Sequence, residues 1–327
     1  MTKRLVVAMF VFLAAVGGVV SGADAANNCS FTTAGTTMTL DGDCQTDATI
    51  LVPDGMTLDG NGHTITGVDP AGGHFTGAVV ANGGATAHVT RLGVTVAGLA
   101  NVCDAGDQRL RGIMFMGASG SITHNEVTDI NQGPSGCQEG NAIEVRNFGN
   151  APGVVTVEIA HNIVDAYQKT GIVTNGDVAA SIHHNVVSAS ATQANLAANS
   201  VQVGFGARAT VSHNQIAGNQ WCGGGGWAAT AVLVYDSDGV EVSKNNVGGN
   251  ADVGIYGFGD SLVIDNNRVF EDGTDCNVEG YDIGVGDYGV GNQVTNNKVR
   301  GYVQPYDPTS LAGKGKGANK TVPSPHE

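Results

Sequence analysis

A short motif built around one asparagine recurs seven times in this sequence. Its common form is Ile or Val, two variable residues, Asn, one variable residue, and Val or Ile, as in SITHNEV and SIHHNVV. The shared residues are Asn125, Asn162, Asn185, Asn214, Asn245, Asn267 and Asn297. They lie 37, 23, 29, 31, 22 and 30 residues apart. Repeats of about 20 to 50 residues indicate a solenoid, a propeller or an array.

Each repeat also contains a hydrophobic segment before its asparagine motif. Seven such segments begin at Gly112, Ala142, Gly171, Ser200, Ala231, Gly254 and Asp282, with a weaker copy at Ala78. Their period-two alternation is typical of a β-strand with one buried face. Three short strands per repeat, each stacking on the next repeat, predict an all-β solenoid of the parallel β-helix type.

This pattern, over roughly residues 50–303, resembles the right-handed parallel β-helix superfamily, the pectate lyase-like solenoids, and in particular its secreted bacterial members. The segment TLDGNGHTITG at 57–67 is similar to the first coil of many of them. The resemblance implies about eight to ten coils with an internal asparagine ladder. Each asparagine would occupy a two-residue bend, where Asn tolerates the left-handed conformation. The stacked amides would hydrogen-bond along the axis.

The N-terminus resembles that of an exported protein. Lys3 and Arg4 precede an apolar run over residues 5–20, and Ala23-Asp24-Ala25 fits a cleavage site. The pattern predicts a signal peptide over residues 1–25, and the apolar run is short for a membrane span. We therefore expect a secreted, extracellular monomer with no membrane span after cleavage, and a retained N-terminal anchor is the alternative. A cap over 26–50, the β-helix over 51–303 and a disordered, Gly/Lys/Pro-rich tail over 304–327 complete the predicted organisation.

The charge of the chain restricts its partners. The formal net charge is −15, and removing two cations and one carboxylate with the signal peptide gives −16. Nucleic-acid binders carry a basic patch or stripe, so this composition disfavours nucleic acid as a partner. An anionic ligand would need a local basic patch or a bridging cation. We find no calcium motif and assign no cofactor, with calcium left open as a bridging ion.

The six cysteines predict three disulfides, because an even count in an exported chain indicates cross-links. Cys103 and Cys137 fall in the same register on adjacent coils. Cys222 and Cys276 are two coils apart, across the shortest loop. We therefore predict the pairs Cys29–Cys44, Cys103–Cys137 and Cys222–Cys276.

A polar column precedes the ladder asparagines. It consists of His124, His161, His184, His213, Lys244, Asn266 and Asn296, with His183 as an additional histidine. Stacked imidazoles could bind a transition metal. The change to Lys and Asn in later repeats favours an exposed turn instead, as does the lack of a nearby acidic ligand and of zinc-type spacing. We therefore predict no metal site.

The long loops lie between each asparagine motif and the following strand, at 99–110, 130–140, 188–199, 219–229 and 270–280. Solenoids carry such insertions on one face, often the binding face. The neighbouring outward strand positions are predicted to be Met114, Glu144, Val173, Gln202, Leu233 and Tyr256. We expect an oligosaccharide groove here, with candidate binding residues Arg109, Trp221, Trp227 and Tyr256. The alternative is a loop surface with ordinary ion pairs.

Two catalytic schemes fit the residues at this groove. In a lyase or epimerase, Arg111 or Arg109 would neutralise a uronate carboxylate. Lys169, with its pKa lowered by neighbouring cations, would then abstract the C5 proton, and Tyr167 would protonate the leaving oxygen. In a hydrolase, Glu139 and Glu144 would form the carboxylate pair.

The signature motifs of pectate lyases, polygalacturonases and mannuronan epimerases are absent from the chain. We therefore predict a secreted β-helix protein that interacts with extracellular polysaccharide, with a lyase or epimerase reaction as the finer hypothesis. The alternative is a non-catalytic glycan-binding, adhesive or structural envelope solenoid.

Overall fold

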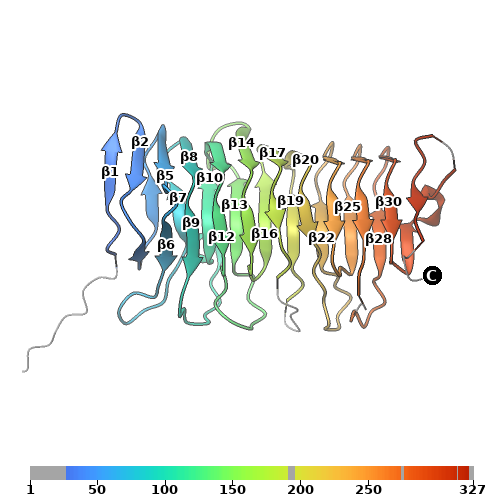
Figure 1. Cartoon of the computed structure of the whole chain (residues 1–327), viewed down its shortest axis with the longest axis horizontal. Helices are drawn as coiled ribbons and strands as arrows, with labels where there is room; N and C mark the ends of the chain where they lie inside the picture. The colour runs from blue at the N-terminus through green and yellow to red at the C-terminus, as the bar shows by residue number, and fades with distance from the viewer. Residues whose placement is uncertain (1–26, 191–195, 274–275, 315, 324–327) are drawn as a thin grey trace, which may run out of the picture.

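The structure is a computed structural model that describes residues 27–190, 196–273, 276–314 and 316–323. The predicted signal peptide lies outside the described residues. Successive coils stack along the long axis of the molecule, so that strands from each coil lie side by side (Figure 1). None of the helices in the described part of the chain has the length and apolar character that a membrane crossing needs.

Three sheets run along this axis, and the described residues give them eleven, eleven and ten strands. Sheet A contains β1 (Phe31–Ala34), β2 (Thr37–Leu40), β5 (Met56–Asp59), β8 (Thr86–Thr90), β11 (Ser119–Thr123), β14 (Val155–Ala160), β17 (Val178–His183), β20 (Arg208–Ser212), β23 (Glu241–Ser243), β26 (Val263–Asp265) and β29 (Gln293–Thr295). Sheet B contains β3 (Cys44–Thr46), β6 (Thr64–Gly67), β9 (Gly93–Val96), β12 (Glu126–Thr128), β15 (Ile163–Asp165), β18 (Val186–Val187), β21 (Gln215–Ala217), β24 (Asn246–Gly248), β27 (Arg268–Phe270), β30 (Lys298–Arg300) and β32 (Lys320–Thr321).

Sheet C carries the second hydrophobic segment of each repeat. It contains β4 (Ile50–Val52), β7 (Ala78–Asn82), β10 (Arg111–Met116), β13 (Asn141–Asn147), β16 (Thr170–Gly176), β19 (Asn199–Gly204), β22 (Thr230–Tyr235), β25 (Val253–Phe258), β28 (Ile283–Asp287) and β31 (Gln304–Asp307). Two short 3-10 helices, η1 (Gly106–Gln108) and η2 (Thr309–Leu311), complete the described elements. The prediction of an all-β solenoid of stacked parallel strands is confirmed.

Stacked aliphatic side chains fill the interior between the three sheets. In sheet C, Ile113 aligns with Ile143 and Ile172 on the next two coils, and all three are fully buried. Because each strand places alternate residues inside, the same register repeats a buried aliphatic residue from coil to coil, until Tyr306 takes this position on β31. This continuous core holds the outward-facing residues of each sheet in fixed rows.

The asparagine ladder runs along the bend between sheets A and B. The Oδ1 atom of Asn185 accepts hydrogen bonds from the Asn162 backbone N–H at 2.9 Å and from Asn162 Nδ2 at 3.0 Å. Asn185 Nδ2 in turn donates to Asn214 Oδ1 and to the carbonyl of Ile159. The same bonds link all seven predicted asparagines, and Asn319, which the sequence analysis missed, adds a further rung after Asn297.

In each bend the residue before the ladder asparagine adopts the left-handed conformation. The prediction that the asparagine itself adopts it was wrong. His124 has φ 59°, His184 has φ 54°, and Lys244 has φ 56°, whereas no ladder asparagine has positive φ. The physical reason is that the amide must point inward to bond its neighbours along the axis. The preceding residue therefore makes the turn and points its side chain away from the core.

The two ends of the solenoid differ from the predicted boundaries. At the N-terminus, β2 already pairs in parallel with β5 of the next coil, and β1 covers its other edge as an antiparallel strand. At the C-terminus, the tail that was expected to be disordered contains β31 and β32, which extend sheets C and B. Asn319 within this tail continues the ladder, which explains why the segment is held in place.

The three disulfides pair as predicted. They are Cys29–Cys44, Cys103–Cys137 and Cys222–Cys276. The first links the segment before the N-terminal hairpin to β3, and the other two join loops on one side of the solenoid. These loops border the outer face of sheet C.

Candidate functional site

A groove of about 530 Å³ lies over the outer face of sheet C. It crosses five successive strands, β10, β13, β16, β19 and β22, and is bordered by residues of the long loops. The outward row along these strands is the predicted one, because Met114, Glu144, Val173, Gln202, Leu233 and Tyr256 are consecutive register partners. Five strands at a spacing of about 4.8 Å give this groove a length of roughly 19 Å.

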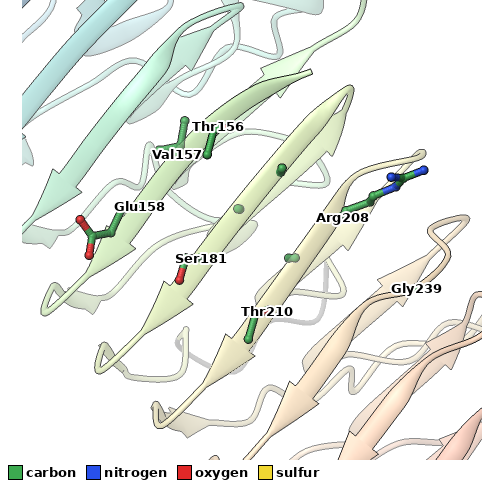
Figure 2. Close-up of a pocket in the computed structure, with 10 residues that line it drawn as sticks. Thr156, Val157, Glu158, Ser181, Arg208, Thr210 and Gly239 are labelled. Atoms are coloured by element: carbon green, nitrogen blue, oxygen red, sulfur yellow. The ribbon is translucent and has the colours of Figure 1, made fainter. Parts of the chain in front are cut away.

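A second, shallower hollow of about 370 Å³ lies on the outer face of sheet A, across β14, β17 and β20 (Figure 2). Most of its lining is small, such as Ser181 and Thr210, and its charged members are Glu158 and Arg208 (Figure 2). The groove over sheet C has more charged, amide and aromatic groups, so we take it as the candidate site.

A buried ion-pair network lies in the floor of this groove. Arg111 Nε donates to Glu144 Oε2 at 2.5 Å, and both side chains are almost completely buried. Glu144 Oε1 lies 3.5 Å from Arg146 Nη1, and Arg146 also pairs with Asp107. The Arg111 guanidinium further donates to the carbonyls of Arg109 and Gly106 in the preceding loop. This network fixes the loop against the sheet, because a buried charge needs partners for all its donors.

Lys169 lines the groove just before β16. Its Nζ donates a 2.6 Å hydrogen bond to the carbonyl of Ala197 on the next coil. Burial lowers the pKa of Lys169 to about 8, because desolvation disfavours the ammonium form. The predicted direction of this pKa shift is therefore found, but its cause is burial and not neighbouring cations.

Two of the predicted catalytic residues do not reach the groove. Tyr167 is fully buried, its hydroxyl donates to Ser200 Oγ at 2.8 Å, and burial raises its pKa to about 12. Glu139 is also buried, and its carboxylate accepts hydrogen bonds from the backbone N–H groups of Asp104 and Leu110. Both residues are structural, since one fills the core and the other holds a loop. The hydrolase pair Glu139 and Glu144 is therefore wrong.

Of the predicted aromatic binding residues, some line the groove and others do not. Trp227 lines the groove and is 65% exposed. Trp221 is buried, and its indole N–H donates to the carbonyl of Gly224 within its own loop. Tyr256 is half-buried in the outward row, one coil beyond the strands that line the groove. Of the predicted cations, Arg109 lines the groove and is half-buried, whereas Arg111 is almost fully buried.

A row of exposed aromatic side chains borders the groove on the side opposite the loops, and the sequence analysis missed it. Phe148, Phe205 and Tyr235 line the groove, and the row continues through Phe258 to Tyr288. Consecutive ring centroids are 6.4, 5.5, 6.1 and 5.2 Å apart. These residues follow or end strands of sheet C, so the signal was an aromatic at the end of several of these hydrophobic segments.

Amide side chains occupy the floor between the cations and the aromatic row. Asn199 Nδ2 donates to Gln202 Oε1 at 3.2 Å, and Gln202 Nε2 lies 3.5 Å from Asn175 Oδ1. Asn141 Nδ2 donates to Glu144 Oε2 at 2.8 Å. Each amide offers both donors and acceptors, so this floor can exchange hydrogen bonds with a ligand rich in hydroxyl groups.

Comparisons with known proteins agree with this architecture. A family model described as the right handed beta helix region matches residues 141–305, about half of the chain. The chain therefore belongs to the right-handed beta helix family.

Among solved structures, the crystal structure of Dettilon tailspike protein (gp208) is similar, with a TM-score of 0.50 and 13% sequence identity. The match covers 88% of this chain and 55% of that chain, so this chain spans only about half of the tailspike chain. At this identity the likeness concerns the fold alone. No curated protein matches the sequence significantly.

Proposed function

We propose that this protein binds an acidic polysaccharide in the groove over sheet C. The observation that carries this proposal is the charge of the lining. Arg109, Arg111, Arg146 and Lys169 line the groove. Glu144 and Asp107 form ion pairs with Arg111 and Arg146, so Arg109 and Lys169 supply the surplus positive charge of the lining. The chain as a whole has a net charge of −15. An anionic polymer is repelled by most of such a surface and attracted to a local cluster of cations.

The shape and composition of the groove favour a sugar polymer over a small anion. Its length of roughly 19 Å accepts several units of an extended chain. The aromatic side chains Phe148, Phe205, Tyr235 and Trp227 offer flat apolar faces for sugar rings, and the amides offer partners for hydroxyls. Arg109 and Lys169 are half-buried, whereas Arg111 and Arg146 are buried, so Arg109 and Lys169 would contact the uronate groups.

We also propose an extracellular location. Three disulfides cross-link the chain, and such bonds persist in oxidising compartments. An exported polysaccharide-binding solenoid accounts for both the disulfides and the groove.

A second candidate function is a lyase or epimerase reaction in the same groove. The observation that favours it is Lys169, because a lysine with a pKa of about 8 releases its proton close to neutral pH. Arg109 in the same groove would neutralise the uronate carboxylate and make the C5 proton more acidic. Tyr167 takes no part, since its hydroxyl is in the core.

An array of charged and neutral polysaccharides tests the binding proposal. We expect the protein to retain uronate-rich polymers and to release neutral ones, with retention reduced by added salt. Equal retention of neutral polymers, or none of any polymer, would contradict the proposal. The absorbance of unsaturated uronate products, and exchange of the C5 hydrogen with solvent, then distinguish a lyase or an epimerase from a binding protein.

A further inference from the structure

Three histidines from two adjacent coils form a cluster at the bend between sheets A and B. His161 and His184 occupy equivalent left-handed positions, with φ 57° and 54°, and their rings stack with centroids 5.1 Å apart. His183 is the last residue of β17, and its ring stands nearly perpendicular to both others. One ligand nitrogen from each of the three lies within 4.8 Å of the other two.

The spacing of these nitrogens fits a shared ion. His183 Nδ1 lies 3.0 Å from His184 Nδ1. Two nitrogens bound to tetrahedral zinc at about 2.0–2.1 Å lie about 3.3 Å apart. The His183–His184 pair is therefore close to a metal-binding distance. The His161 nitrogen needs a shift of at most about 1.5 Å, which rotation of an exposed ring can provide.

A carboxylate from the neighbouring coil orients His183. Glu158 Oε1 lies 3.2 Å from His183 Nε2, on the side of the ring away from His184. Because a carboxylate only accepts hydrogen bonds, this contact favours the His183 tautomer with its proton on Nε2, which leaves the Nδ1 lone pair on the side of His184 for a metal ion. Metal-binding histidines commonly donate their second ring N–H to a carboxylate in this way. Glu158 lies 25 residues before His183 in the chain, so the sequence alone does not reveal this acidic partner.

We propose that His161, His183 and His184 bind one divalent transition-metal ion, with Glu158 as the residue that positions His183. Three imidazole nitrogens suit zinc, copper or nickel and disfavour magnesium and calcium. A three-histidine set leaves the fourth position of a tetrahedral ion for water or an added ligand. The site lies at the sheet A–sheet B bend, and the proposed polysaccharide groove lies over sheet C, so the two proposals are independent.

The repeat itself supplies conservative replacements for the test. Asn occupies the same left-handed column at Asn266 and Asn296, so His161→Asn and His184→Asn keep the bend. Ser212 is the register partner of His183, so His183→Ser keeps the strand. His124→Asn is the matched control, because His124 stacks on His161 at 4.9 Å but is outside the cluster.

The experiment is titration of the metal-free protein, without a histidine tag, with Zn²⁺ by calorimetry and with Co²⁺ by visible absorption. We expect one ion per chain and a tetrahedral Co²⁺ spectrum. Each of the three cluster variants should weaken Zn²⁺ binding at least ~10-fold, and Glu158→Gln should weaken it by about 10-fold. His124→Asn should leave the affinity within about twofold.

Two results would overturn the proposal. One is an absence of stoichiometric Zn²⁺ binding by the folded wild-type protein. The other is an equal loss of affinity in His124→Asn, which would show diffuse binding along the imidazole column and no defined site. Thermal melting of each variant confirms that the fold is retained, so a loss of binding reports on the ligands.

Discussion

Arg111 and Glu144 form a hydrogen-bonded ion pair across adjacent coils, with Nε and Oε2 2.5 Å apart and both side chains almost fully buried. Because the two side chains are buried and hydrogen-bonded in the floor of the groove, their positions are fixed by the residues around them. They set the positions of the loop that carries Arg109 and of the amide of Asn141. The pair therefore shapes the candidate site, whereas Arg109 and Lys169 remain the better exposed cations.

Breaking this pair should destabilise the protein. Glu144→Ala leaves the Arg111 charge buried without its partner, and we expect the free energy of unfolding to fall by about 3 kcal/mol. Gln202→Ala is the control at the same outward row two coils on, where neutral amide contacts of 3.2 and 3.5 Å should cost less than about 1 kcal/mol. Urea denaturation measures both. Equal costs would show that the ion pair has no special structural role.

Removing one rung of the ladder should also lower stability. Asn185→Ala deprives the Asn162 backbone N–H and side-chain amide of their acceptor inside the solenoid. The free energy of unfolding should fall by about 1–3 kcal/mol. Gln215→Ala, at an exposed strand position of the next coil, should change it very little. A wild-type melting curve for Asn185→Ala would contradict the structural role of the ladder.

Binding of an anionic polysaccharide should depend on pH through Lys169. The pKa of Lys169 is lowered to about 8 by burial, so the side chain is a cation below this pH and neutral above it. We therefore expect affinity to fall as pH rises from about 7 to 9. Lys169→Met should bind more weakly at pH 7 and lose this pH dependence. An identical pH profile in both proteins would show that Lys169 does not contact the ligand.

The aromatic row should contribute to binding without a charge effect. Tyr235→Ala removes a ring that lines the groove and is 47% exposed, and we expect about a 3- to 10-fold loss of polysaccharide affinity. Added salt should not change this loss. Val290→Ala, an exposed apolar residue outside the groove lining, serves as the control and should bind like wild type. Wild-type affinity in Tyr235→Ala would show that the aromatic row does not contact the polysaccharide.

The repeat made much of the fold predictable, because one register applies to every coil. Met114, Glu144 and Gln202 were placed in one outward row since period-two alternation leaves a strand only two faces. Cys103 and Cys137 were paired from the same register. The conformation of the bend was harder to predict from the sequence. The motif shows which residues recur, but it does not show whether His184 or Asn185 adopts the left-handed conformation.

The candidate site was less predictable because much of it lies in loops, where no period fixes the direction of a side chain. Glu139 and Tyr167 flank strands of sheet C, which predicts that both reach the groove, yet Glu139 binds loop N–H groups and Tyr167 enters the core. Phe148 and Phe205 are 57 positions apart in sequence, and only the stacking of coils brings their rings to 6.4 Å. Glu158 and His183 meet in the same way.

The proposed groove is tested best by the affinity of the folded protein for a uronate polymer, measured by calorimetry at low and high salt. We compare the wild type with an Arg109→Gln, Lys169→Gln double variant, which removes the two better exposed cations of the groove. We expect saturable binding by the wild type that weakens with salt, and at least a ~10-fold weaker affinity with a reduced salt dependence in the variant. Wild-type affinity in the double variant, or no binding by either protein, would contradict this expectation.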